Sequence, residues 1–132
     1  MSVNAKPAIH VVGTGLNPST LPPGIARIVN AAEVLFGGKR ILQAFDEHPA
    51  RKIAIRAPVS ETVEAVRRES AAGQQVVILA DGDPGFFGIG KRLVQDLGPD
   101  RVHVHPNVTV LQVAASRLKT TWEDVRTVSL HG

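Results

Sequence analysis

The sequence predicts an α/β domain built on an open, mainly parallel sheet of five strands, with helices on both faces. Short aliphatic runs alternate with helical patterns along the chain, as in βαβ crossovers. The run 76–80 is entirely apolar and too short for a typical helix, which indicates a strand buried on both faces. Glycine-rich loops follow this run and the run 8–12, at the sheet edge where such folds bind ligands.

Local signals place the individual elements. Pro22 or Pro23 suits the first turn of a helix. Ser60 is a good N-cap, and Gly98 closes a helix that begins near residue 89. Strands are therefore expected at 8–12, 34–36, 52–55, 76–80 and 101–105, and helices at 22–32, 39–45, 60–73, 89–97 and 107–118. A capped helical turn at 120–124 and a last strand at 125–130 complete the prediction.

The length of 132 residues predicts a single domain. Residues 1–7 are expected to be a disordered leader, and residues 8–132 to form the α/β domain. The chain stops directly after the expected last strand, where a loop or crossover would normally follow. This ending suggests a chain cut at a domain boundary.

Composition excludes several kinds of site and partner. The chain has no cysteine, so it has neither a disulfide framework nor a thiolate metal site. No apolar run approaches a membrane span and the first residues lack an apolar signal core, which predicts a cytoplasmic protein. The formal charge is +3, but the bases lie in scattered pairs without interleaved aromatics, so no nucleic-acid partner is expected. A basic surface still suits a small molecule with several negative charges.

Two glycine motifs match nucleotide-binding sequences only in part. Gly13 and Gly15 follow the first strand, as in a dinucleotide-binding fingerprint, but the third glycine and the acidic residue after the second strand are missing. Residues 37–39 lack the spacing of a phosphate-binding loop, which disfavours an NTPase. A nucleotide-dependent oxidoreductase remains an alternative.

Other residues have two interpretations each. Asp81 and Asp83 are either a general acid/base pair or caps that accept hydrogen bonds from the backbone of their loop. Phe86 and Phe87 are either anchors at a helix start, or one of them is the floor of a pocket for a flat ligand. His103 and His105 share one strand face, and without cysteine or a nearby pair of carboxylates a polar strand face is favoured over a metal site.

Four motifs in order make the chain recognisable. They are Val-Val-Gly-Thr-Gly at 11–15, Glu-Val-Leu-Phe-Gly-Gly-Lys-Arg at 33–40, Ala-Asp-Gly-Asp-Pro-Gly-Phe-Phe-Gly-Ile-Gly at 80–90, and Trp-Glu-Asp with Ser-Leu-His-Gly between 122 and 132. Together they resemble the N-terminal lobe of the tetrapyrrole methylases. The branch that looks most similar comprises the precorrin-6Y and cobalt-precorrin-7 methylases, and the resemblance runs from Ile9 to the last residue.

The resemblance implies an S-adenosylmethionine-dependent C-methyltransferase that acts on a precorrin in cobalamin biosynthesis. The cofactor would lie between two α/β lobes, of which this chain is the first, inactive without the missing C-terminal lobe. A homo-oligomer is expected, and no metal. No catalytic residue is assigned. By position, the cofactor would contact Gly82, Asp83, Phe86, Thr109 and Val110, while Gly13 and Gly15 would shape the opening for the macrocycle.

The chain departs from the family pattern at two places. Residues 16–18 read Leu-Asn-Pro where the family often has Pro-Gly-Asp, and Asn107 replaces the glycine of a Pro-Gly-Val turn. Asparagine tolerates left-handed backbone, so the second change is mild. A non-catalytic, partner-binding module derived from the same fold remains the alternative function. The methylated carbon, the presence of cobalt and a fused decarboxylating domain are left open.

Overall fold

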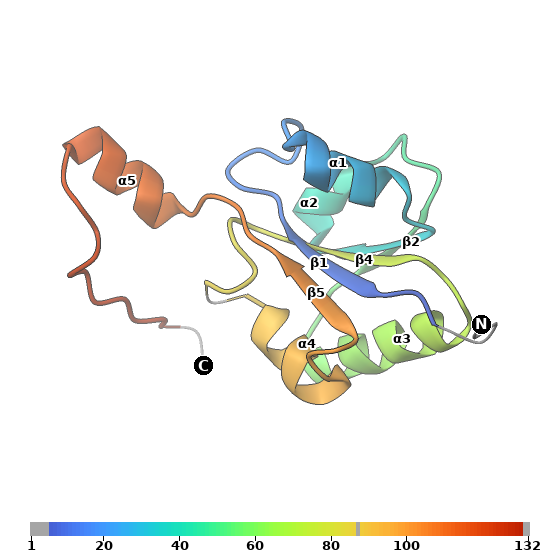
Figure 1. The fold of residues 1–132 in the computed structure, drawn as a ribbon. Helices are drawn as coiled ribbons and strands as arrows, with labels where there is room; N and C mark the ends of the chain where they lie inside the picture. The colour runs from blue at the N-terminus through green and yellow to red at the C-terminus, as the bar shows by residue number, and fades with distance from the viewer. Residues whose placement is uncertain (1–5, 87, 131–132) are drawn as a thin grey trace.

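The computed structural model describes residues 6–86 and 88–130. One sheet of five parallel strands forms its centre, in the order β3-β2-β4-β1-β5 (Figure 1). The predicted fold class is therefore confirmed. The strands are β1 (Ile9–Gly13), β2 (Val34–Gly37), β3 (Arg51–Ala54), β4 (Val76–Ala80) and β5 (Val102–His105). The helices are α1 (Pro23–Asn30), α2 (Lys39–Gln43), α3 (Val59–Ala71), α4 (Gly90–Leu97) and α5 (Val110–Leu118).

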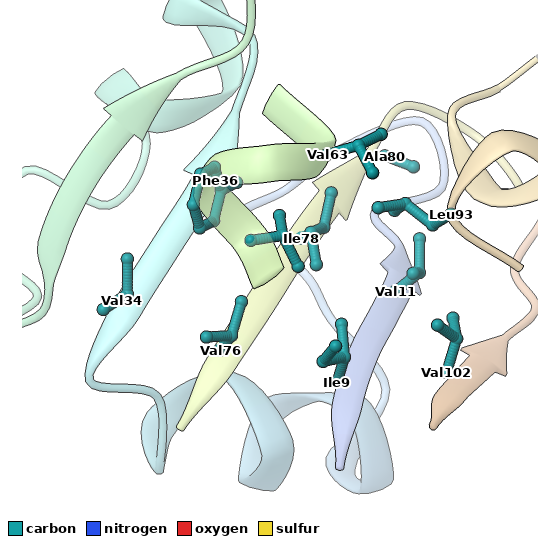
Figure 2. Close-up of a cluster of buried hydrophobic side chains, with 11 residues drawn as sticks. Ile9, Val11, Val34, Phe36, Val63, Val76, Ile78, Ala80, Leu93 and Val102 are labelled. Carbon is teal, nitrogen blue, oxygen red and sulfur yellow. The ribbon is translucent and has the colours of Figure 1, made fainter. Parts of the chain in front are cut away.

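The sheet buries both of its faces. Helices α1 and α2 cover one face, and α3 and α4 cover the other (Figure 1). Along β4, Val76, Ile78 and Ala80 join the core under α3 and α4 (Figure 2). Val77 and Leu79 join the core under α1 and α2. Because β4 lies between β1 and β2 and helices cover both faces of the sheet, all of its residues are buried, which explains its unbroken apolar run.

The direction of the chain across the sheet reverses between β1 and β4. From β1 the chain passes through α1 to β2, whereas from β4 it passes through α4 to β5 on the opposite side. Two neighbouring strands are thus followed by helices on opposite faces of the sheet. The loops that leave their carboxyl ends diverge at this switch point, the usual ligand position in open α/β sheets.

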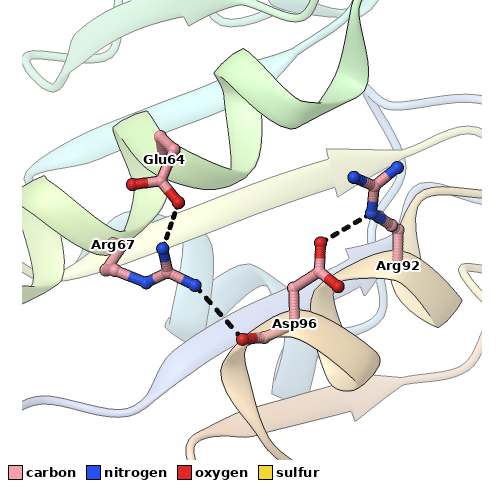
Figure 3. A network of polar contacts seen from close by, with 4 residues as sticks. All are labelled: Glu64, Arg67, Arg92 and Asp96. Atoms are coloured by element: carbon pink, nitrogen blue, oxygen red, sulfur yellow. Dashed lines mark hydrogen bonds and ion pairs between the residues drawn. The ribbon is translucent and has the colours of Figure 1, made fainter.

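Polar contacts join α3 to α4 on the surface (Figure 3). Arg67 pairs with Glu64 on α3 and donates through Nη2 to the backbone oxygen of Asp96 on α4, at 3.2 Å. The Asp96 carboxylate accepts from Arg92 Nε at 2.6 Å. These side chains are largely exposed, so each ion pair adds little to stability.

The expected N-cap of α3 is wrong. The helix begins at Val59, and Pro58 occupies the N-cap position without any side-chain hydrogen bond to the first turn. Ser60 therefore lies inside the first turn. Glu61 is the acidic residue there, as expected for the positive end of a helix.

The strand expected at 125–130 is also wrong, because these residues form no strand. Helix α5 and the segment after it lead away from the sheet (Figure 1), so no strand edge lies beside them to pair with. The capped helical turn at 120–124 is reduced to one turn in which Val125 N donates to Trp122 O at 3.1 Å. Residues 131–132 of the predicted ending lie outside the described part.

Most of the expected leader also falls outside the description, which begins at residue 6. The carbonyl of Pro7 accepts a hydrogen bond from Arg101 Nη2 at 3.3 Å, and Arg101 also donates to Ser70 Oγ at 2.6 Å. These bonds tie the start of the described chain to the amino end of the sheet. A disordered leader over the first residues stays a prediction.

Candidate functional site

Three loops meet at the carboxyl edge of the sheet. They follow β1 (residues 14–22), β4 (81–89, of which 87 is not described) and β5 (106–109). The first two are joined directly: Gly15 N donates to Gly82 O, and Gly82 N donates to Gly15 O, each at 3.0 Å. Thr14 adds a hydrogen bond from its hydroxyl to the carbonyl of Ala80 at 3.0 Å. The turn carrying Gly82 therefore lies at the same end of the sheet as the turn carrying Gly13.

Glycine is required where these loops touch. A Cβ on Gly13 would come within 2.4 Å of the Gly82 carbonyl oxygen and 2.8 Å of Asn107 Cβ. Gly15 and Gly82 have φ angles of +64° and +61°, which side-chain-bearing residues adopt rarely. Gly13 is buried beneath this contact. It supports the loops from below, while Gly15 and Gly82 line the cavity above them.

The cavity at the switch point has a volume of about 630 Å³. This size is typical of small-molecule sites, which span roughly 300–1,000 Å³. All five residues predicted for the cofactor lie on its wall, brought together from the loop after β4 and the start of α5. They are Gly82, Asp83, Phe86, Thr109 and Val110.

Sequence reasoning missed the opposite wall of the cavity. Gly38, Ile41 and Ile55 come from the segments that follow β2 and β3, and Leu79 from the end of β4. Gly38 belongs to the motif at 33–40, which was not assigned to the cofactor, and the other three positions belong to no motif. Only the strand order, which brings β2 beside β4, places them across from Gly82 and Asp83.

The carboxylate of Asp83 joins two loops. Its Oδ2 accepts from Gly85 N at 2.8 Å within its own loop, and its Oδ1 accepts from Asn107 N at 2.9 Å in the loop after β5. This arrangement matches the loop-capping interpretation. Asp81, which also lines the cavity, is exposed.

Asn107 is a second link that the sequence did not identify. Its Nδ2 donates to the carbonyl of Gly13 at 2.9 Å, and its Oδ1 accepts from Val108 N at 2.8 Å. The departure from the family glycine was the available signal. This departure indicated only that asparagine can adopt the backbone conformation of the glycine it replaces. The loop that Asn107 contacts could not be located from the sequence.

Thr109 is the N-cap of α5 and is buried. Its hydroxyl accepts from Gln112 N at 3.2 Å, and the Gln112 side chain accepts from Thr109 N at 2.7 Å. This reciprocal pair is a capping box, whose Thr-x-x-Gln signature was present in the sequence. It fixes the position at which Thr109 and Val110 face the cavity.

Three histidines lie together on β1 and β5. His10 Nδ1 and His105 Nε2 are 3.0 Å apart, and the His103 ring meets the His10 ring edge-on with centroids 5.4 Å apart. Burial lowers the pKa of His10, and the nearby imidazoles of His105 and His103 lower it further. Burial and His103 lower the pKa of His105 in the same way. The polar strand face predicted from His103 and His105 therefore includes His10 as well.

Two kinds of feature are absent from the described residues. No group of three or more His, Cys, Asp or Glu side chains is arranged to hold a metal ion. None of the described helices is both long and apolar enough to cross a membrane.

Comparison with known proteins agrees with the geometry. A sequence profile of the family described as Tetrapyrrole (Corrin/Porphyrin) Methylases matches residues 8–132. A cobalt-precorrin-7 C(5)-methyltransferase of Salmonella typhimurium is 30% identical over 127 residues, covering 94% of this chain and 61% of that protein. The crystal structure of a precorrin-6Y methylase of cobalamin biosynthesis from Archaeoglobus fulgidus has a TM-score of 0.73 and 26% identity, covering 94% of this chain and 65% of that one.

A second solved structure contains a ligand. It is a uroporphyrin-III C-methyltransferase from Thermus thermophilus complexed with S-adenosylhomocysteine, with a TM-score of 0.65 and 27% identity. The match covers 82% of this chain and 51% of that one. The chain thus spans less than two thirds of the length of these relatives.

Proposed function

Because this chain belongs to the tetrapyrrole (corrin/porphyrin) methylase family, we propose that it forms the cofactor-binding lobe of an S-adenosylmethionine-dependent C-methyltransferase acting on a precorrin in cobalamin biosynthesis. The observation that carries the proposal is the cavity at the switch point. Its wall gathers every residue that the family pattern assigns to the cofactor, from two separate segments of the chain.

The lining suits such a cofactor. Ile41, Ile55 and Phe86 give apolar surface against which a flat ring packs, and Gly82 places no side chain between its loop and the cavity. The carboxylates of Asp81 and Asp83 attract a cation such as a sulfonium. S-adenosylmethionine supplies an already activated methyl group when bound. The chain's own task is therefore to bind and orient the donor, an effect worth about 7–11 kcal/mol in well-aligned reactions.

The surface beside the cavity suits a macrocycle with several carboxylates. Lys39 and Arg40 are exposed between the lining residues Gly38 and Ile41, and Arg56 is exposed directly after Ile55. At these positions the three cations would form a basic rim on the side of β2 and β3. On the other side, Gly15 would shape the opening directly, and the buried Gly13 would do so only by supporting the loop that carries Gly15.

The remaining assignments are predictions that follow from the family. A second lobe would complete the site, the chain would assemble as a homo-oligomer, and the protein would work in the cytoplasm. The length of the relatives supports the second lobe, since this chain matches only 61% of the Salmonella protein.

A charge placed on the cavity wall tests the site. Val110 is exposed, lines the cavity and begins α5. Val110→Lys should weaken binding of cationic S-adenosylmethionine about three- to tenfold more than binding of S-adenosylhomocysteine, which lacks the sulfonium charge. Calorimetry on the complete gene product measures both affinities. Val128→Lys, the same change at an exposed position beyond α5, should alter neither. Unchanged binding in Val110→Lys would refute the site.

Asp83→Ala separates the proposed enzyme from a non-catalytic module. The change removes the acceptor for both Gly85 N and Asn107 N, so it should abolish methylation by the complete gene product. A partner-binding module would keep its function.

The oxidoreductase alternative has a test of its own. If it were correct, adding NAD(H) would have to shift the melting temperature of the protein.

A further inference from the structure

We propose that Asn107 is a positioning residue for the cofactor cavity, holding the loop after β1 against the loops after β4 and β5. The part of the test that measures ligand affinity rests on the function proposed above. We call the hydrogen bonds of Asn107 with Gly13, Val108 and Asp83 the clasp. The clasp can be tested without a ligand.

Three hydrogen bonds converge on this one residue. Its side chain donates to Gly13 O at 2.9 Å and accepts from Val108 N at 2.8 Å, while its backbone N donates to Asp83 Oδ1 at 2.9 Å. Asn107 is half-buried. It therefore connects the ends of β1, β4 and β5, the strands around which the site is built.

The loop that Asn107 holds forms a partition, that is, a wall shared by two neighbouring cavities. Gly15 and Leu16 line the 630 Å³ cavity, and they also line a second cavity of about 300 Å³ that includes Asn107. A Cβ on Gly15 would come within 3.0 Å of Asn107 Oδ1, so side chain and loop are in close contact. A shift of this loop changes the shape of the cofactor cavity directly.

The position requires a donor and an acceptor on one short side chain. Aspartate would keep the acceptor for Val108 N but present an oxygen to the Gly13 carbonyl, and glycine would supply neither group. The family that the sequence resembles often has glycine here. This chain therefore closes the partition with a bond that a glycine-bearing relative cannot form.

Asn107→Asp isolates the bond to Gly13. At pH 7.5 the complete gene product carrying this change should bind S-adenosylhomocysteine about three- to tenfold more weakly than the wild type, as expected for one lost hydrogen bond. Towards pH 4, close to the ordinary aspartate pKa of about 3.9, the ratio of the two affinities should move towards one, because a protonated carboxyl donates to the Gly13 carbonyl again. A merely structural role would not produce this pH profile. A ratio that is one at pH 7.5, or that does not change with pH, would overturn the proposal.

Asn107→Gly tests the clasp independently of any ligand. Amide hydrogen exchange of peptides spanning 13–16 should accelerate about three- to tenfold in this variant, while exchange in β4 stays at the wild-type rate. Asn30→Asp adds the same charge as Asn107→Asp, at an exposed site on the last residue of α1, and should behave as the wild type. Equal exchange of 13–16 in wild type and Asn107→Gly would refute the clasp. If the wild type bound no S-adenosylhomocysteine but exchange of 13–16 still accelerated in Asn107→Gly, only the proposed function would be refuted.

Discussion

At the scale of single residues, the site depends on groups that join loops. The sequence left Asp83 with two interpretations, an acid/base partner or a loop cap. Both of its oxygens accept backbone hydrogen bonds, one of them from a loop 24 positions away. The sequence could not decide between the interpretations, because the deciding donor, Asn107 N, is brought near only by the pairing of the strands. The Asp83 carboxylate thus holds the loops that shape the cavity and also places a negative charge on its wall.

Gly13 gives a prediction at this scale. A Cβ there would meet the Gly82 carbonyl at 2.4 Å, and backbone cannot rotate away as a side chain can. Gly13→Ala should therefore destabilise the domain by about 1–3 kcal/mol, the usual cost of overpacking. Urea denaturation of the chain measures the change.

Gly24→Ala is the matched control. Gly24 lies in the first turn of α1, and nothing approaches its would-be Cβ within 4 Å. The same substitution should therefore raise stability here, by about 0.5–1 kcal/mol, because alanine favours the helix. If Gly13→Ala were as stable as Gly24→Ala, the close contact between the loops would be disproved.

At the scale of elements, the sequence pattern predicted most reliably the strands whose two faces are both buried in the sheet. The run 76–80 predicted a doubly buried strand, and β4 is that strand with the same bounds. The segment 125–130, Val-Arg-Thr-Val-Ser-Leu, also contains β-branched and apolar residues, but a strand exists only where a partner edge is present. Since α5 leads away from the sheet, Val128 and Leu130 remain exposed. Local pattern was sufficient for elements that pack on the sheet and insufficient for one that does not.

The pairing of β1 with β5 predicts how stability depends on pH. His10 and His105 have pKa values lowered below 6.5 in the folded protein, first by burial and then by neighbouring imidazoles. In the unfolded chain they return to about 6.5. Below that pH the unfolded state binds more protons than the folded state, so the free energy of unfolding should fall as the pH drops through this window. Urea denaturation between pH 7.5 and pH 5 measures it.

His105→Asn identifies the source of that dependence. The change removes one titrating ring and also the positive charge that lowers the pKa of His10. The variant should lose less stability than wild type between pH 7.5 and pH 5. A slope equal to that of wild type would assign the pH dependence to groups other than this histidine pair.

At the scale of the molecule, strand order explains why the site was only half predictable. The motif residues after β4 and β5 could be assigned to the cofactor by position, and all of them line the cavity. The facing wall, with Ile41 and Ile55, follows from β4 lying beside β2, a pairing between strands distant in sequence. The sequence pattern therefore predicted the loops that carry the cofactor-binding motif residues. The strand order, which the sequence did not reveal, determines the surface that faces them.

The same view of the whole molecule predicts what the 132-residue chain does alone. Small-molecule sites usually bury roughly 70–90% of their ligand, and in the proposed two-lobed enzyme this chain would supply only one wall of the site. The isolated chain should therefore bind S-adenosylhomocysteine only weakly, with a Kd of about 1 mM or above. Calorimetry of the chain, with its folding verified by a cooperative thermal transition, gives the value, and the intact Salmonella relative serves as the reference for a complete site. Micromolar binding by the chain alone would mean that one lobe holds the cofactor unaided, and the second lobe would then be needed for the macrocycle rather than for the methyl donor.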